Sequence, residues 1–82
     1  MPPVKILLIR WGLNSTYATK RATSAEIEEV LLSRPTIRRN LRGRTSTHVA
    51  YGKTRAGRRL AVAFIYDAEL HSARPITAWE KR

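Results

Sequence analysis

The stretch Arg58-Arg59-Leu60-Ala61-Val62-Ala63-Phe64-Ile65-Tyr66 decides the fold of this chain. Large apolar side chains at its even positions alternate with alanine and isoleucine at its odd positions, so the segment is apolar on both faces. A strand with two apolar faces is covered on both sides, which favours a central place in a sheet. The pattern therefore predicts a central strand over Arg58–Tyr66.

Shorter strand-like segments flank this stretch and are separated by glycines and turn residues. The loop Thr54–Gly57 has the length of a hairpin turn in which Gly57 takes a positive φ, and Asp67-Ala68 is short enough for a second hairpin. We therefore expect an antiparallel meander of three strands, with Arg58–Tyr66 as the middle strand. The flanking strands are predicted over Thr36–Leu41, Thr45–Lys53 and Glu69–Arg74.

The N-terminal half predicts one strand and two helices. Val4–Arg10 is dominated by branched apolar residues and predicts a buried strand, and Asn14 is a possible N-cap for a weak helix through Arg21. Thr23 and Glu26 have the spacing of a capping box, which predicts a helix that ends before Arg34-Pro35. Its apolar stripe is predicted to be Ile27, Val30 and Leu31.

The C-terminal segment repeats the capping-box spacing. Thr77 and Glu80 predict a short terminal helix that carries Trp79, after Pro75 closes the last strand. The expected fold class is α+β: one domain over residues 1–82, with an N-terminal strand, two helices, a curved antiparallel sheet and a short C-terminal helix.

The strong positive charge of the chain favours functions that involve a negatively charged partner. Sixteen Lys and Arg against six Asp and Glu give a net charge of +10, and the segment from Arg34 to Arg59 holds nine basic residues and no acid. Such a surface is typical of proteins that bind RNA, the ribosome or another polyanion. Twelve of the sixteen cations are arginine, whose planar fork suits bidentate phosphate contacts.

Several site types are not expected. The chain has no cysteine, and two histidines, His48 and His71, do not make a zinc site alone, so we expect neither a metal nor a cofactor. The apolar run near the N-terminus is too short for a signal peptide or a membrane span. A soluble, cytoplasmic protein is expected.

Three segments resemble the BrnT toxins, a group of RelE-like bacterial ribonucleases. The closing segment Ser72–Arg82 is similar to the family's ending, and Tyr51–Leu60 is similar to its glycine- and base-rich hairpin. Trp11 and Asn14, followed by the acidic helix Ser24–Leu31, make the third match. The resemblance implies a RelE-like fold, metal-independent RNA cleavage that arrests translation, and a BrnA-like antitoxin as the partner of a type II toxin–antitoxin pair.

Metal-independent cleavage needs a group that moves protons and fixed cations that stabilise the charged phosphorus. Arg74, on the family match, is the first candidate for the cation, and Lys53 and Arg58 flank the hairpin. His71 and Glu80 are candidates for proton transfer, although a structural histidine and a capping glutamate are the explanations that the pattern favours for these two residues. The predicted catalytic residues are Arg74, Lys53, Arg58, His71 and Glu80.

A second set is predicted to bind RNA. Tyr51 can stack on a base, and the arginines supply attraction to phosphate that does not depend on sequence. The set is Arg38, Arg39, Arg42, Arg44, Tyr51, Arg55 and Arg59. A non-catalytic RNA- or ribosome-binding module is the alternative to the nuclease, and a DNA-binding or scaffolding protein is a further one.

Overall fold

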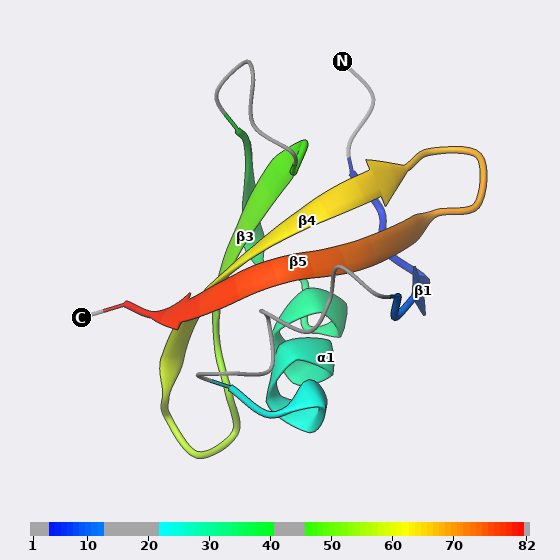
Figure 1. Cartoon of the computed structure of the whole chain (residues 1–82). Coiled ribbons are helices and arrows are strands. Elements are labelled where there is room, and N and C mark those ends of the chain that lie inside the picture. The colour runs from blue at the N-terminus through cyan, green and yellow to red at the C-terminus, as the bar shows by residue number, and fades with distance from the viewer. Residues whose placement is uncertain (1–3, 13–21, 41–45, 82) are drawn as a thin grey trace.

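A computed structural model describes residues 4–12, 22–40 and 46–81 (Figure 1). The elements are β1 (Leu8–Ile9), α1 (Ser24–Leu32), β2 (Thr36–Arg39), β3 (His48–Lys53), β4 (Arg59–Asp67) and β5 (Ser72–Glu80). The strands form one sheet in the order β1-β5-β4-β3-β2, in which β1 runs parallel to β5 and the other neighbours are antiparallel. Helix α1 lies against one side of the curved sheet.

The central place of β4 is confirmed. Leu60, Val62 and Phe64 face α1 and are at most 1% exposed, in the same cluster as Ile27 and Leu31 of the helix. The alanines of β4 point to the opposite side of the sheet, where they pack with Val49, Tyr51 and Trp79. Because β4 has apolar side chains on both faces, it gains from burial on both sides, as only an inner strand can.

The capping box of α1 is confirmed as well. Glu26 N donates to Thr23 Oγ1 at 3.1 Å, and Thr23 N donates to Glu26 Oε1 at 3.0 Å. Ile27, Val30 and Leu31 are the buried residues of the helix. The helix ends when Arg34 takes a left-handed conformation with φ of 58° before Pro35.

The prediction of a C-terminal helix is wrong. Residues 77–80 continue β5, where Thr77 pairs with Ala63 and Trp79 with Ala61. Pro75 pairs with Phe64, so Ile76 is an extra residue that forms a bulge. A strand tolerates a proline next to a bulge because the pairing there does not need the missing N–H of Pro75. Pairing with the long β4 therefore outweighs the local capping pattern at Thr77.

The expected α+β, RelE-like fold with two helices and a terminal helix is corrected accordingly. The described residues form mostly a five-stranded mixed sheet with one short helix. The helix expected over 14–21 lies outside the described residues. The N-terminal strand is also shorter than Val4–Arg10, and it is not buried throughout, because Leu7 and Leu8 are 61% and 50% exposed.

The β4–β5 turn is longer than the expected Asp67-Ala68 hairpin. Asp67 Oδ1 accepts hydrogen bonds from the backbone N of Glu69 and of Leu70, at 3.0 and 3.3 Å. His71 closes the turn with φ of 49°. The β3–β4 turn matches its expectation, since Gly57 has φ of 88°.

Candidate nucleic-acid interface

The face of the sheet opposite α1 presents side chains from β3, β4 and β5. Strand register places Lys53 opposite Arg59, and Tyr51 opposite Ala61, which in turn pairs with Trp79. These residues alternate with the ones that face the helix, so all five project to the side that α1 does not cover. We call this side the open face.

A groove of about 480 Å³ lies at one end of the open face. Four of its lining residues are Lys or Arg, each is exposed, and none of the others is acidic. We call this feature the basic groove, and it is lined by Thr36, Arg38, Tyr51, Gly52, Lys53, Arg59, Leu60 and Lys81. The lining residues come from positions between Thr36 and Lys81 that are far apart in the chain, so only the folded sheet brings them together.

The cations of the basic groove repel one another. Lys53 and Arg59 are direct cross-strand partners, and like charges in that position are unfavourable. Among the described residues, no ion pair neutralises Arg38, Lys53, Arg59 or Lys81. An anion in the groove would therefore relieve a repulsion that the fold imposes.

Tyr51 supplies an aromatic ring inside this groove. It is half-buried, and Lys81 Nζ lies 4.8 Å from the centre of its ring, which is a cation–π distance. A flat ring among cations can hold a nucleobase while the cations hold the adjoining phosphates.

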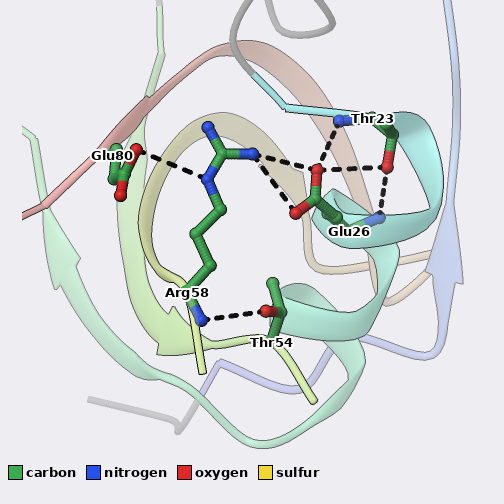
Figure 2. A network of polar contacts seen from close by, with 5 residues as sticks. All are labelled: Thr23, Glu26, Thr54, Arg58 and Glu80. Carbon is green, nitrogen blue, oxygen red and sulfur yellow. Dashed lines mark hydrogen bonds and ion pairs between the residues drawn. The ribbon is translucent and has the colours of Figure 1, made fainter. Parts of the chain in front are cut away.

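Arg58 lies outside the groove, on the helix side (Figure 2). Its Nη1 donates to Glu26 Oε1 at 3.1 Å and to Oε2 at 3.2 Å, and its Nε lies 3.5 Å from Glu80 Oε2. Its backbone N donates to Thr54 Oγ1 at 3.1 Å. Two predicted catalytic residues, Arg58 and Glu80, are thus brought together as an ion pair that ties the hairpin and β5 to α1.

The same contacts set the charge states of the ion pair. The backbone N–H of Thr23, and then Arg58, hold the pKa of Glu26 below its ordinary value. The hydrogen bond and charge of Glu26 raise the pKa of Arg58 above its ordinary value, with a smaller effect from Glu80. Both groups are therefore held in their charged forms.

Arg74 and His71 lie at the other end of β5. Arg74 is exposed and pairs with Ile65, and Lys81 is seven residues farther along the chain, a span of roughly 23 Å for extended backbone. His71 is in the turn, with Nδ1 3.4 Å from the hydroxyl oxygen of Tyr66. The predicted catalytic residues thus fall into three places, and only Lys53 lines the basic groove.

The predicted RNA-binding residues divide in a similar way. Arg38, Tyr51 and Arg59 line the basic groove. Arg39 pairs with His48 along the strands, and the backbone N of Arg55 donates to Glu29 Oε1 at 3.1 Å on the helix side. Arg42 and Arg44 lie outside the described residues. Lys81 and Thr36 were not predicted, because strand register, rather than spacing along the chain, places them beside Tyr51.

His48 packs against two aromatic rings of β4. Its ring stacks on Phe64 with centroids 5.7 Å apart and meets Tyr66 edge to face at the same separation. Its Nδ1 lies 2.9 Å from Thr47 Oγ1. Burial, and then the positive charge of Arg39, lower the pKa of His48.

Neither a metal site nor a membrane-spanning helix is found in residues 4–12, 22–40 and 46–81. These residues hold no group of three or more His, Asp or Glu side chains that could bind a metal ion. They also include no helix with the length and apolar character needed to cross a membrane.

Comparison with protein-family models, with curated proteins and with solved structures finds no match to this chain. Function is therefore inferred from the site itself.

Proposed function

We propose that this chain binds RNA, with phosphates held in the basic groove and a base stacked on Tyr51. One observation carries the proposal: Arg38, Lys53, Arg59 and Lys81 line one groove together with the ring of Tyr51, and no acidic residue lines it. A protein surface that only has to be soluble does not require four cations in the same groove as an aromatic ring. A chain of phosphates and bases matches both components.

Electrostatics supports this proposal over binding of a small neutral ligand. The net charge of +10 attracts a polyanion at long range, and release of counterions from the nucleic acid adds to affinity. The two arginines of the groove can each make a bidentate phosphate contact. The groove is an open surface feature, so a polymer can pass through it.

Metal-independent RNA cleavage is a second candidate function, favoured by the position of the Tyr51 phenol. Tyr51 can move a proton while the surrounding cations stabilise charge on the phosphorus. The segment Tyr51–Leu60, which resembles the BrnT hairpin, contributes five of the eight lining residues of the groove. A cytoplasmic toxin that arrests translation and is held by a BrnA-like antitoxin belongs to this second candidate.

The test compares two exposed arginines on either side of the same hairpin. Fluorescence anisotropy would follow binding of a labelled single-stranded RNA across a range of NaCl concentrations. We expect Arg59→Ser to weaken binding and to reduce the slope of log affinity against log salt by about 0.7. Arg55→Ser removes the same charge outside the groove and should leave the slope nearly unchanged. Equal losses in both variants would indicate attraction by net charge alone and would contradict the proposal.

Cleavage is tested on the same RNA in the presence of EDTA. Products with 2′,3′-cyclic phosphate ends that disappear in Tyr51→Phe, while binding remains, would support the second candidate. Intact RNA after prolonged incubation with the folded wild-type protein would leave binding as the function.

A further inference from the structure

A second groove lies on the helix side of the molecule, between the N-terminal segment and the end of α1. It has a volume of about 450 Å³. Its charged lining residues are Lys5 and Arg34, and its apolar lining consists of Val4, Ile6, Leu7, Leu31, Leu32, Pro35 and Ile37. We call it the leucine groove.

Three leucines in or beside the leucine groove are at least half exposed. Leu7 is 61% exposed and Leu32 is 53% exposed, and the neighbouring Leu8 is 50% exposed. Leu31 forms the floor and is only 1% exposed. Single exposed leucines are ordinary, but leucines gathered around a hollow with a buried floor are typical of interaction sites.

Two cations line this apolar hollow. Lys5 and Arg34 are exposed, and neither forms an ion pair within the described residues. Glu28 and Glu29 of α1 lie on the other flank of Leu32, where they line a separate hollow with the cations Lys53 and Arg55. The leucine groove is therefore apolar inside and positive at its edge.

We propose that the leucine groove is the docking site for an acidic, amphipathic segment of a protein partner. A row of apolar side chains would occupy the groove, and carboxylates beside that row would pair with Lys5 and Arg34. Burial of the exposed leucines supplies the affinity, while the charge pairs select an acidic segment.

Two other occupants fit the groove less well. A second copy of this chain carries the same charge of +10 and would bring like-charged edges together. A lipid surface meets protruding side chains, whereas Leu31 lies recessed at the floor of a hollow.

This site is separate from the basic groove. Leu31 and Leu32 belong to α1, which covers one side of the sheet, and the basic groove lies on the open face. RNA and the acidic segment can therefore bind at the same time, and the docking proposal does not depend on RNA binding.

The experiment uses a synthetic helix-forming peptide of about 18 residues, with leucines at i, i+3, i+4 and i+7 and glutamates elsewhere. A scrambled peptide of equal composition has the same charge but no apolar row. Isothermal titration should give saturable binding of the amphipathic peptide and at least about tenfold weaker binding of the scrambled one.

Variants of the full chain locate the site. Leu32→Ser and Leu7→Ser should each weaken peptide binding about tenfold, whereas Leu70→Ser should not. Leu70 is a matched control because it is 50% exposed in the β4–β5 turn and does not line the groove. Circular dichroism checks that each variant is folded, and Arg59→Ser, which weakens RNA binding, should bind the peptide nearly as the wild type does.

Three results would overturn the proposal. Equal affinity for the two peptides would mean that charge alone attracts them. Self-association in sedimentation velocity that Leu32→Ser abolishes would assign the groove to a second copy. Flotation with phosphatidylcholine–phosphatidylserine vesicles that Leu32→Ser abolishes, without specific peptide binding, would assign it to a lipid surface.

Discussion

Arg58 Nη1 contacts both carboxylate oxygens of Glu26, at 3.1 and 3.2 Å, across 32 positions of the chain. The same carboxylate accepts the backbone N–H of Thr23, so Glu26 closes the first turn of α1 and also receives the hairpin arginine. This relationship places Arg58 on the side of the sheet opposite the basic groove. It also gives Glu26 a measurable effect on stability.

Stability should fall in acid through Glu26. The pKa of its carboxyl is lowered from 4.5 in the folded state, first by the Thr23 N–H. The unfolded chain therefore takes up the proton more readily, so this contribution is complete above about pH 4.5 and is lost as the pH falls through the lower folded value. Glu26→Gln keeps an oxygen for the Thr23 N–H but removes the charge. Thermal melts from pH 3 to 7 should show a smaller acid loss in this variant than in Glu69→Gln, an exposed control; identical profiles would contradict the assignment.

A separate loss of stability is expected at milder acidity through His48. Burial against the core, and then Arg39, lower the pKa of this imidazole from 6.5 in the folded state. Protonation therefore favours the unfolded chain, and stability decreases as the pH falls below about 6.5. His48→Gln should remove this decrease between pH 5 and 7 in denaturant titrations. If the slope in that range is the same in both proteins, His48 is not its source.

Gly52 has space for no side chain on the helix side. An added Cβ would lie 3.0 Å from Val30 Cγ1 and 3.4 Å from Pro35 Cβ. Gly52→Ala should therefore reduce the free energy of unfolding by about 1–3 kcal/mol. In a double-mutant cycle, Val30→Ala should recover part of that loss, because it removes the contacting methyl. Additive losses in urea titrations would mean that the crowding is not at Val30.

Two substitutions of Tyr51 should separate stacking of its ring on a base from a contact made by its hydroxyl group. Tyr51→Ala should weaken binding of single-stranded RNA by about 1–3 kcal/mol, the usual value of one stacked base. Tyr51→Phe keeps the ring and should bind nearly as the wild type does, as measured by anisotropy at fixed salt. Weak binding in both variants would assign the contact to the hydroxyl group and would argue against stacking.

The sequence alone determined the parts of the fold whose signals are local. The two apolar faces of Arg58–Tyr66 predict a central strand, and β4 is central. Thr23 and Glu26 are three positions apart, so their capping box forms within one helical turn. The positive charge of the surface was also evident, because it depends on composition and not on folding.

Only the tertiary structure decided the C-terminal strand and the composition of the basic groove. Thr77 and Glu80 carry the same local signal as the true capping box, but residues 77–80 pair with β4 from Leu60 to Ala63 and continue β5 instead. Arg38 and Lys81 meet Tyr51 because strand register brings distant positions together. Register depends on pairing between segments far apart in the chain, and no local pattern contains that information.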